Sequence, residues 1–348
     1  MRHTNVSIRG ERILNIEENR PKWHLAALGE LLIDFTPVGK SRQGGALFER
    51  NPGGAPANVL VVASKLGLST AFIGKVGQDA FGEFLKDTLV KQGVDTKGLI
   101  MTTEANTTLA FVHLDEGGDR LFSFYRNPGA DMLLKESEVD EGILKESSIF
   151  HFGSVSMTKE PARRATLKAV ERAVALGKTI SYDPNLRPPL WDSEREAKEI
   201  ISQGLPFADI LKISEEELEF LTDQKDPDIG SRLLYEKYKT SIILVTLGPD
   251  GCFYRSGEIA GYSPGFQVST IDTTGAGDAF MGGFLYQFIK SGKGVAELDG
   301  RELGEAVKFA NAMGALTTTK RGAIPAIPSM EEVSKTCLEG VSSDIKEC

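Results

Sequence analysis

Short apolar runs alternate with amphipathic stretches along most of the chain. The apolar runs predict strands, and the amphipathic stretches, in which apolar residues recur every three to four positions, predict helices. Gly67, Gly93 and Gly177 stand where a glycine commonly follows the end of a helix. The predicted strands cover residues 25–35, 70–76, 148–152, 178–183, 210–213 and 242–247, and predicted helices cover residues 57–66, 79–92 and 161–176. This alternation predicts an α/β fold with a parallel sheet covered on both faces, which binds ligands beyond the carboxyl ends of its strands.

One stretch breaks the alternation. Within residues 107–127, two runs of period two flank the loop 115–119, which predicts a β-hairpin. Residues 36–51 lack a helical period as well, and the two segments together predict a small sheet outside the main one. A lid is the natural function of such a piece, and a plain antiparallel edge of the main sheet is the alternative. Residues 1–22 are polar and aperiodic, which indicates a loose extension before a single domain of residues 23–340.

Composition and charge narrow the class of protein. The formal net charge of −9 argues against nonspecific nucleic-acid binding, because that requires a basic face. No apolar run approaches the roughly 18 residues of a membrane span and no apolar leader opens the chain, so we predict a cytoplasmic protein without membrane contact. The 4 histidines include no pair at i,i+4, which argues against a zinc site. The 3 cysteines are far apart, as is typical of a reduced protein: Cys252, Cys337 and Cys348.

The segment Asp272-Thr-Thr-Gly-Ala-Gly-Asp278 carries the most informative chemistry. It precedes residues 279–290, whose large apolar residues form a helical stripe that Gly292 can end. A glycine-rich turn that opens into a helix makes an anion site, since unpaired backbone N–H groups and the helix dipole both favour negative charge. A carboxylate at such a site suits a base that takes a proton from an incoming hydroxyl. The alternative is that Asp278 only caps the helix, and the segment alone favours neither.

Two other nucleotide motifs fail on inspection. A Walker loop ending at Gly39-Lys40-Ser41 would need a glycine at position 34, where the chain has Asp34. The segment 275–280 lacks the third glycine of a dinucleotide fingerprint and lies late in the chain.

Two widely separated motifs resemble one known family. Residues 272–280 (Asp-Thr-Thr-Gly-Ala-Gly-Asp-Ala-Phe) resemble the C-terminal signature of the ribokinase-like carbohydrate kinases, and residues 51–58 (Asn-Pro-Gly-Gly-Ala-Pro-Ala-Asn) resemble the family's N-terminal sugar-site motif. The resemblance runs from about Leu25 to Ser329. It implies a doubly wound α/β fold with a β-sheet lid that is often used for dimerisation. It further implies that Asp278 is the catalytic base and that the amides of Gly275, Ala276 and Gly277 form the anion hole.

The same resemblance assigns the sugar side of the site. Asp34, at the end of the first predicted strand, is similar to the aspartate that binds sugar hydroxyls, and a carboxylate can accept two such hydrogen bonds. Gly53, Gly54 and Asn58 match the family's other sugar-contacting positions. The alternatives are a strand-end turn residue for Asp34, and for the others a turn followed by a helix start.

Three further residues belong to segments that resemble fructokinases within the family. Arg126 lies on the predicted hairpin, on the same face as Phe122 and Phe124, and the resemblance implies that it contacts the substrate from the lid; a solvated strand arginine is the alternative. Asn185 and Arg187 follow a predicted strand at the edge where ligands bind. Arg187 could neutralise phosphate charge, or it could instead pair with Asp183 or Asp192.

The nucleotide side is implied by the second half of the chain. The turn Thr246-Leu-Gly-Pro-Asp-Gly251 resembles the family's nucleotide-phosphate turn and places Thr246, Gly248 and Gly251 near ATP, although a simple hairpin turn would use the same Pro-Asp-Gly. Asn311 lies on a predicted helix and resembles the position on the adenosine side. Lys212 belongs to the same half.

Two ion sites follow from the resemblance alone. Glu217 is similar to the family's glutamate that organises Mg²⁺ through water, although Ser214 replaces the usual asparagine and Glu217 could equally lie on the surface of an acidic helix. Backbone carbonyls around Asp272 and Thr274, and near Gly322, match the region where relatives hold a monovalent cation such as K⁺.

These observations together predict an ATP-dependent sugar kinase. The expected substrates are MgATP and D-fructose, phosphorylated at its C6 hydroxyl, and the expected assembly is a homodimer formed through the lid. Ribose, 2-keto-3-deoxygluconate or a riboside is the alternative acceptor, and a non-catalytic binding protein is the alternative class.

Overall fold

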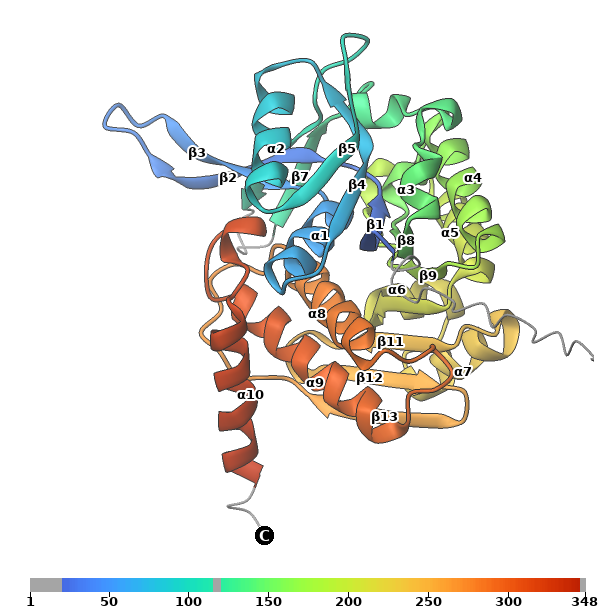
Figure 1. Ribbon diagram of the computed structural model, residues 1–348. Coiled ribbons are helices and arrows are strands. Elements are labelled where there is room, and N and C mark those ends of the chain that lie inside the picture. The colour runs from blue at the N-terminus through green and yellow to red at the C-terminus, as the bar shows by residue number, and fades with distance from the viewer. Residues whose placement is uncertain (1–20, 115–119, 345–348) are drawn as a thin grey trace, which may run out of the picture.

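The main sheet of the computed structural model has nine strands and is mostly parallel (Figure 1). The structure describes residues 21–114 and 120–344. Strands β12 and β13 are antiparallel to their neighbours at one edge, and all other pairs are parallel. The strands in spatial order are β13 (Ile259–Pro264), β12 (Gly251–Ser256), β11 (Ile242–Thr246), β10 (Ile210–Ser214), β9 (Thr179–Tyr182), β8 (Ser147–Phe152), β1 (Trp23–Leu28), β4 (Thr70–Gly77) and β5 (Val94–Thr102).

Helices cover both faces of this sheet, and each face has its own apolar core. Successive side chains of a strand pack into opposite cores. In β11, Ile242 and Leu244 belong to one core, and Ile243 and Val245 belong to the other. One core includes residues of α1 (Ala55–Lys65), α2 (Ala80–Lys91), α8 (Ala276–Ser291), α9 (Gly300–Thr317) and α10 (Met330–Asp344). The other includes residues of α3 (Glu141–Lys145), α4 (Ala162–Ala175), α5 (Glu194–Gly204), α6 (Glu215–Thr222) and α7 (Pro227–Tyr238). The predicted parallel α/β fold is therefore confirmed.

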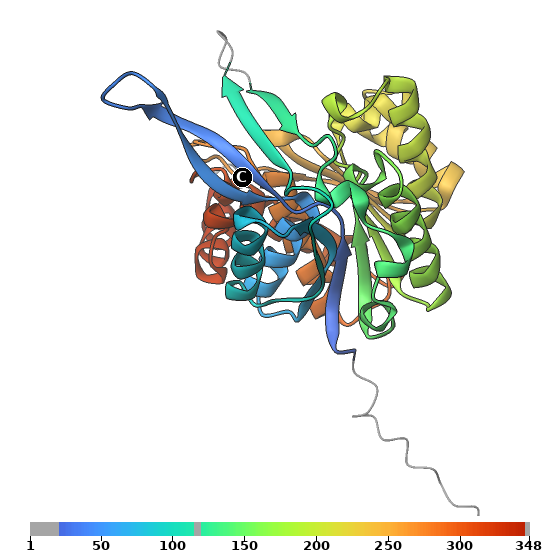
Figure 2. The ribbon, with the colours of Figure 1, turned by 90° about the horizontal axis from the view of Figure 1, so that it is seen from above.

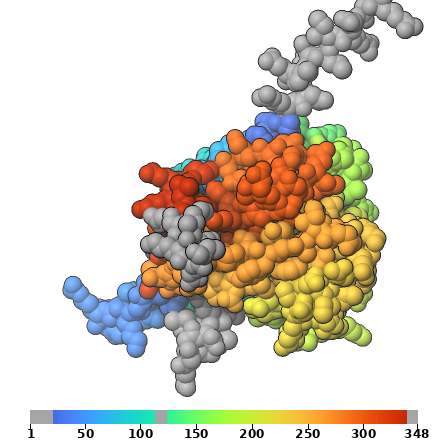
Figure 3. Space-filling view, turned by 90° about the horizontal axis from the view of Figure 1, so that it is seen from below, coloured from blue at the N-terminus to red at the C-terminus, as the bar shows by residue number. Residues whose placement is uncertain are grey.

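A separate four-stranded sheet lies outside the main one. Its hairpin β2–β3 projects well beyond the body of the molecule in all three overall views (Figures 1, 2 and 3). Its strands, in spatial order, are β3 (Ala46–Gly53), β2 (Leu32–Lys40), β6 (Leu109–Leu114) and β7 (Arg120–Tyr125), with β2 and β6 parallel. The small sheet was predicted correctly, and the alternative of an edge of the main sheet is wrong. We call these four strands the lid sheet, and its role as a lid stays a prediction.

The predicted first strand, residues 25–35, is in fact two strands in different sheets. Strand β1 ends at Leu28, the chain turns, and β2 begins at Leu32 in the lid sheet. The turn occurs where the start of α1 presses on the backbone, since a Cβ at Gly29 would lie 2.5 Å from Cγ of Pro56. Asp34 therefore lies within the lid sheet, opposite Asn51, and not at the end of a main-sheet strand.

Aromatic rings attach the lid sheet to the body. Phe35 stacks on Phe111 with ring centroids 4.8 Å apart, and its edge meets Phe81 of α2 at 5.9 Å. The guanidinium of Arg50 lies 3.7 Å from the ring centroid of Phe84, also on α2. The base of the lid sheet is thus fixed on α2.

Two predicted segments lie outside the residues that the structure describes, wholly or almost wholly. The loose extension predicted for residues 1–22 lies almost wholly outside them, as does the hairpin loop 115–119. Within the described ranges, no helix combines the length and the apolar character needed to cross a bilayer.

Candidate active site

A cavity of about 850 Å³ lies beyond the carboxyl ends of β9, β10 and β11, where the lid sheet meets the main sheet. This is the edge at which parallel sheets bind ligands. Most predicted site residues line it, although they come from distant parts of the chain. The predicted residues in its lining are Asp34, Gly54, Asn58, Asn185, Arg187, Lys212, Glu217, Thr246, Gly248, Thr274, Gly275, Gly277 and Asp278.

Asp278 lies at the centre of this cavity's polar contacts. Its Oδ2 accepts a hydrogen bond of 2.8 Å from Nδ2 of Asn58, and its Oδ1 accepts one of 3.2 Å from Nδ2 of Asn185. Burial raises the pKa of the Asp278 carboxyl, while the Asn58 hydrogen bond and the charges of Lys212 and Arg187 act in the opposite direction. The carboxylate is thus oriented by two amides and is a stronger base than an exposed aspartate.

The helix-cap alternative for Asp278 is wrong. Helix α8 begins at Ala276, its N-cap is Gly275, and no side chain makes a cap hydrogen bond there. Asp278 is the third residue of the helix, so its side chain is directed by Asn58 and Asn185 instead. Sequence periodicity had placed the helix start at residue 279, because the small residues 275–277 carry no apolar signal.

The turn 275–277 has the geometry of an anion site. Gly275 has φ of 76° in the left-handed region, and a Cβ there would lie 2.6 Å from Cβ of Ala323, so this position requires glycine. First-turn amides of a helix have no carbonyl partner within that helix. Of the predicted three, Ala276 N–H donates to the carbonyl of Thr273 at 3.2 Å. A Cβ at Gly277 would lie 3.0 Å from Nζ of Lys212, which places a cation beside the turn.

Lys212 forms a buried ion pair that the sequence did not predict. Its Nζ lies 3.0 Å from Oδ2 of Asp183, and both side chains are almost completely buried. Burial raises the pKa of Asp183 to about 7, against the opposing effect of Lys212. Arg187 pairs with neither of its predicted alternatives, because Asp183 binds Lys212 and Asp192 binds Lys159 at 2.6 Å. Arg187 is exposed at the cavity and its charge acts on Asp34 and Asp278.

The sugar-side residues pack closely against one another. Asp34 keeps some exposure along the cavity, yet desolvation raises its pKa to about 7, with Arg187 opposing. A Cβ at Gly53 would collide with the Asp34 carboxylate, so Gly53 lies behind Asp34 while Gly54 lines the cavity. Gly54 has φ of 120°, and a Cβ there would collide with the carbonyl oxygen of Glu30. Because neither glycine has a Cβ, the Asp34 carboxylate can lie against Gly53 and the Glu30 carbonyl oxygen against Gly54.

Arg126 does not line the cavity. It follows β7 and is buried, with its Nη2 2.7 Å from Oδ2 of Asp131 and its Nη1 donating to Oγ1 of Thr158 at 2.8 Å. The alternative of a solvated strand arginine is wrong, and the predicted contact with the sugar is replaced in this structure by a buried ion pair. From the same hairpin it is Phe124 that lines the cavity.

A second cavity, of about 410 Å³, adjoins the first and shares Thr246, Gly248, Thr273 and Gly277 with it. Gly251 and Asn311 line it as predicted, together with apolar residues such as Phe280. Nδ2 of Asn311 donates to the carbonyl oxygen of Ser263 at 3.0 Å, which ties α9 to β13. The Pro-Asp-Gly segment turns β11 into β12, as the hairpin interpretation expects, while its contact with nucleotide phosphates stays a prediction. This cavity reaches the start of α8, where Ala276 and Gly277 belong to its lining.

Glu217 is buried and is not a surface residue, so that alternative is wrong. Its Oε1 accepts from N–H of Leu186 at 2.6 Å and its Oε2 from N–H of Ser214 at 2.8 Å. Oγ of Ser214 accepts in turn from N–H of Glu217, which completes a reciprocal cap of α6 and explains the serine at this position. Glu217 thus holds the loop that carries Asn185 and Arg187.

Asp272 joins the two loops where a monovalent cation was predicted. Its Oδ1 accepts from N–H of Thr274 at 2.8 Å and its Oδ2 from N–H of Gly322 at 3.0 Å. The two loops are therefore held together by one buried carboxylate, which is compatible with carbonyl ligands converging there. Within the described ranges, no group of three or more His, Cys, Asp or Glu side chains could hold a metal ion.

Sequence reasoning missed Glu30, Asp183 and Phe124, all near the reacting groups. Glu30 lies two residues after the end of β1 and Asp183 follows β9 directly, so their places near strand ends were an available signal. Phe124 is one of several aromatic residues in its hairpin, and the sequence does not say which of them faces the cavity.

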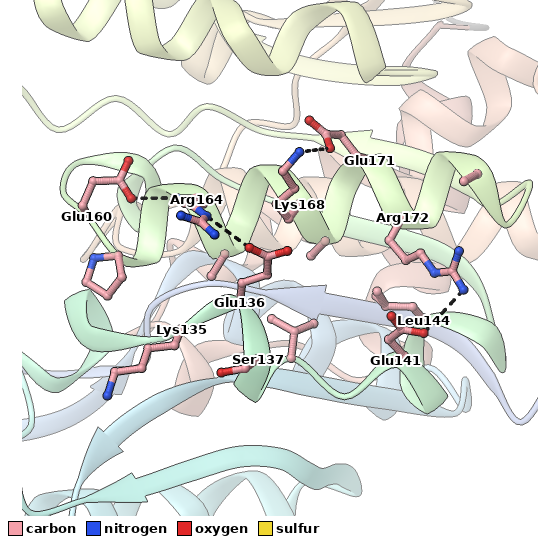
Figure 4. A pocket seen from close by; sticks show the side chains of 15 residues that line it. Lys135, Glu136, Ser137, Glu141, Leu144, Glu160, Arg164, Lys168, Glu171 and Arg172 are labelled. Atoms are coloured by element: carbon pink, nitrogen blue, oxygen red, sulfur yellow. Dashed lines mark hydrogen bonds and ion pairs between the residues drawn. The ribbon is translucent and has the colours of Figure 1, made fainter.

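A larger surface groove, of about 1260 Å³, lies along α4 (Figure 4). Its charged side chains are paired with one another, as with Arg164 and Glu136 at 3.1 Å and Lys168 and Glu171 at 2.6 Å. None of the predicted site residues is among its described lining. We do not assign the reaction to this groove.

The fold, the two adjoining cavities and the buried carboxylate at a helix start together define a phosphotransferase of the ribokinase-like type. Residues 23–330 match the pfkB family of carbohydrate kinases, and the chain belongs to that family. The chain is 46% identical to fructokinase-1 of Zea mays over 89% of this chain and 96% of that protein. Among solved structures, it resembles fructokinase from Xylella fastidiosa with bound ATP (35% identity, TM-score 0.84, 91% of this chain and 99% of that one). It also resembles fructokinase from Vibrio cholerae O395 with fructose, ADP and calcium bound (34% identity, TM-score 0.81, 91% and 99%).

Proposed function

We propose that this protein is an ATP-dependent fructokinase that phosphorylates the C6 hydroxyl of D-fructose, with Asp278 as the general base. The observation that carries the proposal is the position of Asp278. It lies at the start of α8, in the larger cavity, and the residue before it, Gly277, lines both cavities. A hydroxyl in the larger cavity and a phosphate entering from the smaller one would meet at this point.

The geometry supports in-line transfer of the γ-phosphoryl group. Asn58 and Asn185 orient the Asp278 carboxylate toward the hydroxyl, whose proton it takes as the oxygen attacks phosphorus. Charge that develops on the phosphoryl oxygens faces the start of α8 and the ammonium of Lys212. Arg187, exposed at the same cavity, is placed to approach the phosphates as they enter. Closure of the lid sheet would exclude water, which would otherwise accept the phosphoryl group.

The metal that accompanies ATP has a place in this scheme. Mg²⁺ is usually held by phosphate oxygens, waters and one or two carboxylates. Glu217 lines the cavity, and each of its oxygens accepts one backbone N–H, which leaves lone pairs for a bridging water. We also propose a K⁺ ion between the two loops that Asp272 joins. The support for it is that the hydrogen bonds of Asp272 bring the loops at Thr274 and Gly322 together.

Fructose is proposed as the acceptor on the strength of the relatives. A maize fructokinase is 46% identical over nearly its whole length, and the Vibrio cholerae structure, at 34% identity, contains fructose and ADP. The carboxylate and amide groups of Asp34 and Asn58 suit a polyol. Arg126, which sequence comparison favoured as a substrate contact, no longer supports this choice because it is engaged by Asp131.

Two further parts of the proposal concern assembly and location. The lid sheet exposes large apolar side chains, with Tyr125 67% exposed, Leu47 45% and Val38 41%. Such a surface supports a homodimer formed through the lid sheet. We propose a cytoplasmic location, supported by free Cys252 and Cys337.

The proposal is tested by measuring ADP release and the sugar product. We expect the wild type to convert fructose and MgATP to fructose 6-phosphate, identified by ³¹P and ¹³C NMR. Asp278→Asn is close to isosteric and can still accept a hydrogen bond from one of the two amides, but it cannot take a proton, and its kcat should fall by about 10²–10⁴-fold. No turnover of fructose by the wild type, phosphorylation at another hydroxyl, or full activity of the variant would contradict the proposal.

A further inference from the structure

Glu30 occupies the turn between β1 and β2 and lines the larger cavity. Its side chain is 4% exposed. Its Oε1 accepts a hydrogen bond of 2.8 Å from the backbone N–H of Ala55, the first residue of α1. One oxygen of this carboxyl therefore has a structural partner at the start of the helix that carries Asn58.

The other oxygen of Glu30 has no such partner. Oε2 is buried and makes no hydrogen bond within the described part of the chain. A buried carboxylate oxygen left unpaired costs free energy that evolution rarely leaves without a use. The charge of Arg126 favours the charged form of Glu30, but its guanidinium is paired with Asp131 at 2.7 Å, whose charge acts in the opposite direction.

Other carboxylates around the cavity show what is unusual about Glu30. Asp278 accepts from two amides, Asp183 pairs with Lys212, and Glu217 accepts from two backbone N–H groups. Each of these has protein donors for both of its oxygens or a cation beside it. Burial raises the pKa of Glu30 to about 7, as expected for a carboxyl whose lost water has no full replacement.

We propose that Glu30 is a further substrate-binding residue, whose Oε2 accepts a hydrogen bond from a sugar hydroxyl other than the one that is phosphorylated. The inference rests on the proposed function and deepens it. Asp34 lines the same cavity from the adjoining strand β2, so the two carboxylates would bind different hydroxyls of one polyol.

The same contact links sugar binding to the base. Ala55 begins α1, and Asn58 lies three residues further along the helix, where its Nδ2 donates to Asp278. The same Glu30 side chain would therefore bind the sugar through Oε2 and hold the start of α1 through Oε1. Glu30 therefore discriminates among sugars by the position of a hydroxyl and does not touch the transferred phosphate.

The decisive variant is Glu30→Gln. Its amide oxygen can still accept from Ala55 N–H, but its NH₂ group replaces the acceptor Oε2 with a donor. We expect KM for fructose to rise about 10-fold or more, with KM for ATP and the melting temperature close to wild type. Glu30→Leu removes both contacts, and its melting temperature should fall, which reports the structural contact with Ala55 separately.

Deoxy sugars identify the hydroxyl concerned. Wild type and Glu30→Gln are compared on fructose and on 1-deoxy-, 3-deoxy- and 4-deoxy-D-fructose, all of which keep the C6 hydroxyl. For one of these analogues the variant should cause no further loss in kcat/KM, because the hydroxyl that Glu30 binds is already absent. An unchanged KM for fructose in Glu30→Gln would overturn the assignment, as would an equal loss on all four sugars and on 2,5-anhydro-D-mannitol, which lacks the anomeric C2 hydroxyl.

Failure of the proposed function is distinguished by the wild type alone. If the wild type does not phosphorylate fructose, the fructokinase proposal fails. The Glu30 comparison is then made with whichever of ribose or 2-keto-3-deoxygluconate gives the highest kcat/KM, using the same KM criterion. If the wild type does phosphorylate fructose and Glu30→Gln behaves as wild type, only the assignment of Glu30 fails.

Discussion

The hydrogen bond between Asn58 and Asp278 joins two motifs that are 220 residues apart in the sequence. It is also the contact that most directly sets the basicity of Asp278, because it holds the charged form of a carboxyl whose pKa burial raises. Replacing Asn58 by alanine removes this donor while leaving the weaker donor, Asn185 at 3.2 Å, in place. The variant therefore tests whether Asp278 acts as a base with a tuned pKa.

The expected size of the effect follows from the contact. A hydrogen bond to a charged group contributes about 1.5–3 kcal/mol. Since one pKa unit corresponds to about 1.36 kcal/mol, its loss should raise the pKa of Asp278 by about one to two units. The sign is fixed, because removing a donor to the carboxylate destabilises the charged form. The acidic limb of the kcat/KM profile should move to higher pH by the same amount.

The measurement is kcat/KM for fructose across the pH range in which the protein stays folded, with direct detection of the sugar phosphate. Asn58 is also a predicted sugar contact, so the maximum kcat/KM of the variant should fall. The pH at which the acidic limb of the profile lies depends only on the pKa of the base. Asn106→Ala, at an exposed asparagine, is the matched control and should superimpose on the wild type. A limb that stays in place in Asn58→Ala, or that moves to lower pH, would refute the role of this contact.

Two further predictions concern the other buried charges. Lys212→Met leaves Asp183 buried without its cation, which should cost about 3–5 kcal/mol in the free energy of unfolding at pH 8. The cost should be smaller at lower pH, because loss of the lysine raises the pKa of the buried Asp183 carboxyl further and a bound proton then neutralises it. Denaturant titration of Lys212→Met and of the double variant Asp183→Asn/Lys212→Met checks this, since the double variant should regain stability but not activity. Asp34 has a folded pKa of about 7 against an ordinary value of 3.8, so the protein loses stability from this group as pH rises through that window. Between pH 5 and pH 8, in the absence of sugar, the stability of Asp34→Asn relative to the wild type should therefore rise by about 2.6 kcal/mol, and a difference that does not depend on pH would contradict this reasoning.

The sequence was a good guide where a pattern is local. Alternating apolar runs located most strands of the main sheet, and the apolar stripe of residues 279–290 located most of α8 behind its glycine turn. It failed where tertiary packing decides. The run 25–35 has the apolar pattern of one strand, and the close packing of Gly29 against Pro56 at the turn is not visible in that pattern. Arg126 was predicted as a lid contact from the resemblance to fructokinases, and its buried ion pair with Asp131 depends on packing that the sequence does not reveal.

The carboxylates around the cavity divide into two groups by how the protein compensates them, and this division bears on their roles. Asp278, Asp183 and Glu217 are each bound by amides, backbone N–H groups or a lysine, so they are held in place whether or not a ligand is present. Within the part of the chain that the structure describes, Asp34 and Glu30 lack protein partners for both oxygens, and desolvation raises their pKa values to about 7. Groups of the first kind suit chemistry and positioning, which require fixed geometry before the substrate arrives. Asp34 and Glu30 would gain hydrogen bonds from the hydroxyl groups of a polyol. Sugar binding should therefore offset the free-energy cost of burying their carboxylates without donors.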